Sequence, residues 1–218
     1  MASMGVEILA ATLAAIGWIS AMVSCVLPLW KVTALIGMKE FSTESTGEGI
    51  WMTCLYQGSG QVHCKPYDSI LALSASLQAA RALTVISIVM GTLGLLMATI
   101  GSKCTNCVDE RAAKARALAA AGAALVLAGL TQMIPVSWFA YSVIVDFNDP
   151  GIPEEKKKEM GAALYLGWAA AALLLIGGSI LCSSCSEPPR KSSDSQPMNI
   201  YPQNKSTDPS EHGRSGYV

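Results

Sequence analysis

Charged side chains and histidine are scarce in this chain of 218 residues. Asp, Glu, Lys and Arg together make up 14% of the sequence, the formal net charge is −1, and His63 and His212 are its two histidines. This balance provides no basic surface for nucleic acid. The long apolar runs contain no carboxylate, and no glycine-rich phosphate loop precedes a polar helix. We therefore expect a protein that is not an enzyme and uses no cofactor or metal ion.

Apolar residues, in contrast, are abundant, since 51% of the chain is hydrophobic. That fraction is too high for an ordinary soluble domain and indicates one integral membrane domain, which we place at residues 1–182. The serine- and proline-rich remainder, 183–218, is too polar to fold alone and is expected to be a disordered tail. Four runs are each long enough to cross about 30 Å of hydrocarbon as a helix. They are residues 8–29, 82–100, 117–139 and 161–181.

The first run has a second interpretation as a secretory signal peptide. We favour a retained span, because the residues before it include Glu7 and neither Lys nor Arg, whereas a signal peptide begins with basic residues. The loop at 101–116 is the densest basic cluster between spans, and the positive-inside rule places it in the cytoplasm. Both termini are then cytoplasmic, and the loops 30–81 and 140–160 are extracellular.

The first extracellular loop contains Cys54 and Cys64 on either side of a glycine-rich turn. The flanking segments have β character, and Gly58 and Gly60 can supply the positive φ of a tight hairpin. Opposed residues of an antiparallel pair lie at a separation that a disulfide can span, and such a bond persists only on the oxidising side of a membrane. Two reduced cysteines in a cytosolic loop are the alternative. We expect a Cys54–Cys64 bond that contributes about 2–3 kcal/mol.

Three local predictions concern the ends of the spans. Apolar residues at near-helical spacing over 69–80 predict a short amphipathic helix on the membrane surface, with Asp68 or Ser69 as its N-cap. Arg81 is expected to snorkel or to bind loop backbone at the edge of the second span. Pro135 either kinks the third span or marks where it leaves the hydrocarbon as a continuing helix.

Cysteine pairs with C-x-x-C spacing follow the second and fourth spans. Zinc or redox chemistry is one interpretation, but no histidine or βαβ pattern accompanies them, and juxtamembrane cysteines favour S-palmitoylation. The chain ends at Tyr217-Val218, and a small apolar residue with a free carboxylate is typical of a PDZ ligand. The paired cysteines are Cys104 with Cys107 and Cys182 with Cys185.

The sequence resembles the claudin family over nearly its whole length, most closely the branch that contains claudins three and four. The family's first-loop signature is Trp, Gly-Leu-Trp, two cysteines and an Arg, and Ile50 replaces the Leu here. The toxin-binding Asn-Pro-Leu-Val turn of that branch is replaced by residues 148–152, so enterotoxin binding is not expected. The matching positions are Trp30, Gly49-Ile50-Trp51, Cys54, Cys64, Arg81, Met1-Ala2-Ser3-Met4-Gly5, Lys103-Cys104-Thr105-Asn106-Cys107, Pro135-Val136-Ser137-Trp138 and Tyr217-Val218.

The resemblance implies a left-handed four-helix membrane bundle with a small extracellular antiparallel sheet, four strands from the first loop and one from the second. It also implies a tight-junction protein that polymerises in the membrane, adheres to partners on the next cell, and seals or selectively opens the paracellular space. The implied partners are other claudins, membrane lipid and junctional PDZ scaffolds. By the same likeness, Ile70 is the knob of a lateral interface, and Phe147 and Met160 of a neighbour line its pocket. Packing of Ile70 on its own sheet or on lipid is the alternative.

Lys65 matches a charge-determining position of the family. A positive side chain there would repel Na⁺ from a narrow aqueous path, and Glu48 and Asp68 lie close enough in sequence to neutralise it. A solvated surface lysine is the alternative. Trp30 and Trp51 are expected to hold the sheet on the bundle, with their N–H groups bonded to backbone, and direct contact across cells is their alternative role.

Other four-span proteins compete with a claudin. A tetraspanin is excluded because its large disulfide-bearing loop follows the third span, whereas the first loop is the larger one here. Peripheral-myelin-type proteins and auxiliary subunits of ion channels share the loop signature and remain alternatives. The PDZ-like end and the cytoplasmic C-x-x-C pairs favour a claudin.

Overall fold

A computed structural model describes residues 4–36, 43–68, 73–101, 111–151 and 157–185. Four long helices dominate it, and each is long and apolar enough to cross a membrane. The expectation of four membrane-length helices is therefore confirmed. The helices are α1 (Met4–Val26), α2 (Ala75–Gly101), α3 (Arg111–Asn148) and α4 (Ala162–Cys185).

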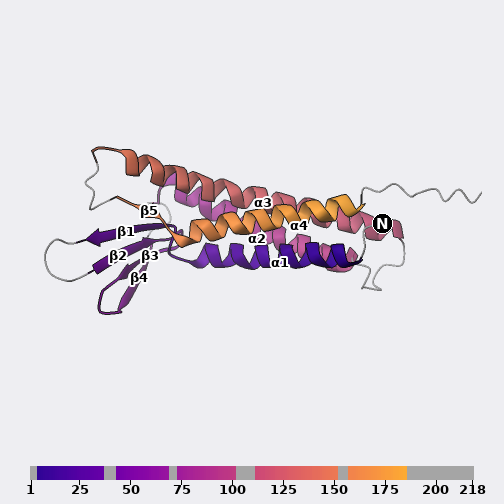
Figure 1. Cartoon of the computed structure of the whole chain (residues 1–218), viewed down its shortest axis with the longest axis horizontal. Coiled ribbons are helices and arrows are strands. Elements are labelled where there is room, and N and C mark those ends of the chain that lie inside the picture. Colours follow the sequence, from indigo (N-terminus) through magenta and orange to yellow (C-terminus); the bar gives the residue numbers. More distant parts are fainter. Residues whose placement is uncertain (1–3, 37–42, 69–72, 102–110, 152–156, 186–218) are drawn as a thin grey trace, which may run out of the picture. The chain divides into compact units, whose positions relative to one another are not determined.

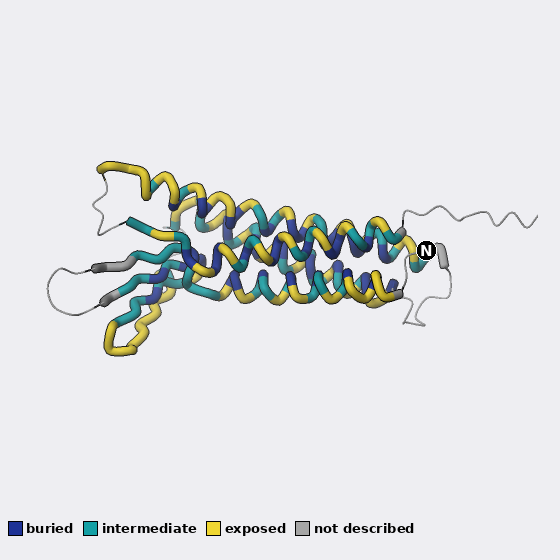
Figure 2. Tube along the Cα trace, viewed as in Figure 1, coloured by how far each residue is buried: buried dark blue, intermediate teal, exposed yellow. Residues whose placement is uncertain are grey.

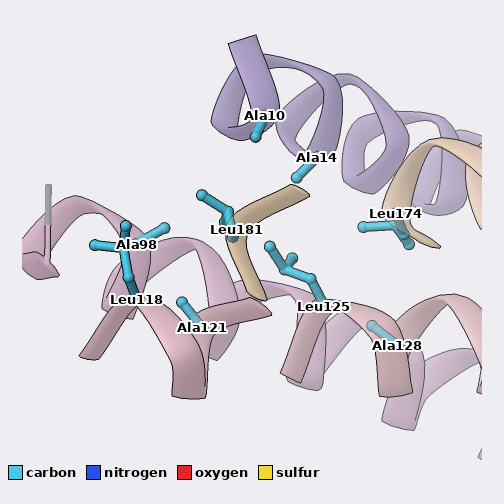
Figure 3. Close-up of a cluster of buried hydrophobic side chains, with 9 residues drawn as sticks. All are labelled: Ala10, Ala14, Ala98, Leu118, Ala121, Leu125, Ala128, Leu174 and Leu181. Carbon is cyan, nitrogen blue, oxygen red and sulfur yellow. The ribbon is translucent and has the colours of Figure 1, made fainter. Parts of the chain in front are cut away.

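The helices pack side by side, with α3 against α2 and α4, and α1 mainly against α4. Small residues fill much of the contact, which lets the backbones approach closely, as is usual for helices in lipid. Leucines from α3 and α4 occupy the remaining space between the helices (Figure 3). The cluster consists of Ala10, Ala14, Ala98, Leu118, Ala121, Leu125, Ala128, Leu174 and Leu181.

Helix α3 is longer than the apolar run that predicted it. Its 38 residues pass through Pro135 without a break and end at Asn148, a length of about 57 Å at 1.5 Å per residue. The expected loop from residue 140 is therefore wrong for residues 140–148, which continue the helix. The reason is packing: Val136, Phe139 and Val143 follow one another at helical spacing and are all buried.

The second span also begins differently from the prediction. Helix α2 starts at Ala75, directly after Ser74, whose carbonyl oxygen accepts hydrogen bonds from the N–H groups of Leu77 and Gln78. Residues 75–80 are thus the first turns of the span itself, so the prediction of a separate surface helix that included them is wrong. Residues 69–72 lie outside the described part of the chain.

Five short strands form one antiparallel sheet beside the ends of the helices (Figure 1). The first four come from the segment between α1 and α2, and the last precedes α4, as the resemblance implies. The spatial order is β4-β3-β2-β1-β5. The strands are β1 (Lys31–Ile36), β2 (Thr43–Glu48), β3 (Met52–Tyr56), β4 (Val62–Pro66) and β5 (Glu159–Met160).

Burial divides the molecule into an inner seam and an exposed apolar coat. Buried positions of each helix face the neighbouring helices, whereas exposed positions lie on the outer faces and on the β3–β4 hairpin (Figure 2). Many exposed side chains on the helices are large and apolar, among them Leu9, Leu96 and Leu127. An apolar coat of this kind suits a bundle that is surrounded by lipid.

Candidate functional site

The β3–β4 hairpin is closed by a disulfide between Cys54 and Cys64. The two residues are directly opposite in the strand register, so the bond predicted from the sequence is present. Gly60 has a φ of +84°, in the region that favours glycine, and its N–H bonds to the carbonyl of Gln57. Gly58 does not share this conformation, so one glycine of the turn has the predicted role.

Gly49 allows the sheet to touch the end of α1. A Cβ atom at this position would lie 2.6 Å from Cα of Pro28, a distance that real side chains do not adopt. The backbone N–H of Gly49 bonds to the carbonyl of Met52, and the Tyr67 hydroxyl donates to the Gly49 carbonyl. Gly49 therefore fixes both the turn into β3 and the close approach of sheet and bundle.

Trp30 is the anchor of the junction between sheet and bundle. Its side chain is fully buried, its indole N–H donates to the carbonyl of Ser24 at 2.8 Å, and its ring meets Phe139 edge to face with centroids 5.1 Å apart. Edge-to-face pairs add stabilisation beyond the buried area. Ile50, also fully buried, belongs to the same apolar cluster, and Met160 packs against it.

Arg81 connects the first turns of α2 to the loop. Its Nε donates to the carbonyl of Ile50 at 2.6 Å, and its guanidinium lies over the rings of Trp51 and Tyr67, 4.9 and 5.6 Å from their centroids. The predicted bond from Arg81 to loop backbone is therefore present. Trp51 differs from the prediction, because its N–H donates to the Sγ of Cys25 instead of to backbone.

Two ion pairs join the first loop to distant parts of the chain. Lys158 donates to both carboxylate oxygens of Glu48 at 2.7 Å, and Lys31 lies 3.9 Å from a carboxylate oxygen of Asp146 on α3. Burial lowers the pKa of Lys31 from its ordinary value, and the positive charge of Lys158 lowers it further, whereas Asp146 and Glu48 act in the opposite direction. Burial is the largest of these effects, so the lowered pKa reflects the cost of burying the Lys31 ammonium.

These features together, a stapled five-stranded sheet anchored by Trp30, Gly49 and Arg81 on four membrane-length helices, have counterparts among known proteins. A sequence model of the PMP-22/EMP/MP20/Claudin family matches residues 4–181. The chain is 50% identical to claudin-4 of Canis lupus familiaris and of Homo sapiens, over 87% of its length and 90% of theirs. It is 48% identical to claudin-3 of Canis lupus familiaris over 99% of this chain and all of that one.

This chain belongs to the claudin family. The match extends over all four helices and the sheet that they carry, so the fold of this claudin is that of its family. The resemblance inferred from the loop signature is confirmed. Because the claudin-3 and claudin-4 sequences align over most of their own length, the likeness is not restricted to one motif.

The structure separates the three charges that the sequence grouped around Lys65. Lys65 and Asp68 form an ion pair of 2.7 Å on the surface, and both side chains are 76% exposed. Glu48 is bound to Lys158 instead. An exposed pair of this kind contributes little to stability, so the arrangement leaves Lys65 available to interact with ions in solution.

The three residues of the expected lateral interface have different surroundings. Phe147 is 48% exposed near the C-terminal end of α3, with the ammonium of Lys157 at 5.1 Å from its ring centroid. Met160 is partly buried in β5 and packs on the Trp30 cluster of this claudin. Ile70 lies outside the described residues.

Most of the predicted cytoplasmic sites also lie outside the described residues. This applies to Cys104, Cys107 and the terminal Tyr217-Val218. Cys182 is on α4 and faces α3, because a Cβ atom at Gly122 would lie 2.6 Å from its Sγ. The side chain of Cys185, at the last residue of α4, is not described.

Sequence reasoning missed the partners of the anchor residues. Phe139, Tyr67 and Lys158 hold Trp30, Gly49 and Glu48 respectively, and each lies 18 or more residues from its partner. Of these three partners, only Phe139 could have been predicted from the sequence, since it continues the buried face of α3 beyond Pro135. The polar contacts depend on chain crossings that no local pattern encodes.

Proposed function

We propose that this claudin-family protein forms tight-junction strands and seals, or charge-selectively gates, the space between epithelial cells. It acts as a structural protein and not as an enzyme. The observation that carries the proposal is the identity of about half with claudin-3 and claudin-4 along nearly the entire chain.

Two surfaces support assembly. The exposed apolar coat of the helices fixes the protein in the membrane, so neighbouring copies meet in two dimensions. The sheet has β4 at one edge, and its residues are all exposed, whereas β5 covers the other edge over two residues only. Copies that join head to tail through unlike surfaces grow into open filaments. We assign the lateral contact to Ile70 on one copy and to Phe147 and Met160 on the next.

The proposal also covers the membrane orientation, the C-terminal tail and the cytoplasmic cysteines. Both termini are cytoplasmic and the sheet is extracellular. The membrane domain ends with α4 at Cys185, three residues beyond the predicted boundary at 182, and residues 186–218 are the cytoplasmic tail. Tyr217 and Val218 bind junctional PDZ scaffolds by strand addition. The cytoplasmic cysteines carry palmitate, which adds about 0.8 kcal/mol of membrane affinity per buried methylene. Cys104, Cys107 and Cys185 are the better acceptors, because Cys182 packs toward α3.

Expression in fibroblasts that lack tight junctions tests the function. A strand-forming claudin should build continuous fibrils at cell contacts, which freeze-fracture electron microscopy detects. The matched control is the Cys54→Ser, Cys64→Ser double variant, which lacks the staple of the sheet and should form few fibrils. Normal surface delivery of the intact protein without fibrils would contradict the proposal and favour an ion-channel auxiliary subunit or a peripheral-myelin-type protein.

A further inference from the structure

Two adjoining hollows lie where the sheet meets α2 and α3. The first is a polar chamber of about 240 Å³ whose lining includes Lys31, Glu48 and Lys158. The second is an apolar groove of about 260 Å³ between the start of α2 and the Pro135 region of α3. Ser76 and Phe139 line both hollows, so the chamber and the groove are neighbours that share a wall.

Ammonium groups outnumber carboxylates among the residues that line the chamber, and Asp146, which pairs with Lys31, lies outside this lining. Two ammonium groups line the chamber, against one carboxylate, and both oxygens of that carboxylate already bind Lys158. Lys31 is 16% exposed, its nearest carboxylate oxygen belongs to Asp146 at 3.9 Å, and the ring of Phe139 lies beneath its ammonium at 5.5 Å. An ammonium held this far from its counter-ion retains N–H donors for an anion.

The groove has the opposite character. Small residues of α2, including Ala75 and Ala79, form one side, and Ile134, Pro135 and Trp138 of α3 form the other. It opens on membrane-length helices at the end where the sheet is attached, and Trp138 beside it is 63% exposed. A half-exposed tryptophan is typical of the boundary between hydrocarbon and headgroups. The neighbour that such a hollow meets in a membrane is an acyl chain.

We propose that the chamber and the groove form one binding site for a phospholipid. Its phosphate lies against Lys31 in the chamber, and the upper part of an acyl chain lies in the groove between Ala79 and Trp138. A sterol fills only the groove, because its single hydroxyl offers no negative charge to the chamber. Only the choice of leaflet, the outer one, rests on the orientation proposed above.

Photocrosslinking of the full-length protein tests this site. The protein is placed as single copies in nanodiscs of phosphatidylcholine with a trace of phosphatidylcholine that carries a diazirine on its acyl chain. Cross-linked peptides should concentrate on the segments around Ala79 and Trp138. Ala79→Trp fills the groove and should lower that labelling at least tenfold, whereas Ala172→Trp, also at an exposed alanine but on α4, should not change it.

A second pair of variants tests the part of the site that binds the phospholipid headgroup. Lys31→Gln should weaken phospholipid labelling about tenfold, the size of one charge-assisted hydrogen bond, and should leave labelling by a sterol diazirine unchanged. Lys65→Gln, at an exposed lysine on β4, is the control and should have no effect. Thermal unfolding and an intact Cys54–Cys64 bond report whether each variant is folded.

Three results would overturn the proposal. They are labelling spread evenly around the helices, labelling that survives Ala79→Trp, and a groove that takes the sterol probe while excess phosphatidylcholine fails to compete. Because the measurement uses isolated copies, it gives the same answer whether or not the protein forms strands in cells.

Discussion

Gln132 is a polar residue in the interior of the bundle. It is fully buried on α3, and neither its amide oxygen nor its amide nitrogen has a hydrogen-bond partner in the structure. The nitrogen would lie 3.6 Å from a Cβ atom placed on Gly167, so the amide is packed against α4. A buried polar group without partners costs free energy in proportion to its lost hydration.

Gln132→Leu should therefore stabilise the protein. Leucine has a similar volume, and removal of the unpartnered amide is worth about 1–3 kcal/mol. Thermal unfolding in detergent measures the change, with Gln132→Asn as the control that keeps the amide and should give no gain. A Leu variant that unfolds at the same or a lower temperature would show that the amide has a partner in the folded protein.

Lys65 carries the prediction on ion selectivity. Its side chain is 76% exposed and is offset by Asp68 alone, since Glu48 is bound elsewhere. Lys65→Asp reverses the charge within a Debye length of about 8 Å of any ion that passes, so the permeability ratio of Na⁺ to Cl⁻ should rise. Dilution potentials across an epithelial monolayer measure this ratio. Lys157→Asp, on the segment between α3 and α4, is the control, and an unchanged ratio for the Lys65 variant would remove Lys65 from the ion path.

At the scale of elements, backbone contacts join the sheet to the bundle in addition to the side chains of Trp30 and Arg81. Gly49 touches Pro28. The N–H of Gly161, just before α4, donates to the carbonyl of Trp30, and the N–H of Ala163, in the first turn of α4, donates to the carbonyl of Leu29. The first loop is thus tied to α1 and to α4 at once. A change that moves one of these backbones must move the others.

Gly49→Ala should loosen this attachment. Its Cβ would clash with the backbone of Pro28, which cannot rotate away as a flexible side chain can. The expected loss is about 1–3 kcal/mol, the usual range for an overpacked site, together with faster hydrogen exchange in β2 and β3. Gly58→Ala, in the exposed hairpin turn, is the control and should leave exchange in these strands unchanged. Equal protection in wild type and Gly49→Ala would show that the contact is not structural.

The elements differ in how far sequence could predict them. Four apolar runs indicated the helices, and the opposed Cys54 and Cys64 indicated the hairpin, because both signals are local. The end of α3 was misplaced because the predicted run stopped at residue 139, shortly after Pro135, although residues 140–145 are still mostly apolar and the buried face of the helix continues to Val143. Pairing of β1 with β5 and of Glu48 with Lys158 depends on residues more than 100 positions apart, which no single segment encodes.

For the whole molecule, the orientation in the membrane is the property on which the function depends. Intact cells treated with an impermeant reductant and then an impermeant maleimide should acquire label at Cys54 and Cys64. The tail contains the sequon Asn204-Lys205-Ser206, which should remain unglycosylated because it never enters the secretory lumen. If the two cysteines were labelled only after permeabilisation, or if Asn204 carried a sugar, the orientation would be the reverse of the one proposed. The proposed barrier function would then be wrong.

Helix α3 passes without interruption from the bundle to the level of the sheet, where Asp146 faces Lys31. At about 57 Å it is nearly twice as long as the hydrocarbon is thick. Tension between neighbouring cells that pulls on the sheet would therefore be passed along one continuous helix into the lipid-embedded part, and Pro135, which removes a backbone hydrogen bond, is the point where that helix can bend. Junctions built from such units should respond to stretching by yielding between copies and at Pro135 before the rest of a copy is deformed.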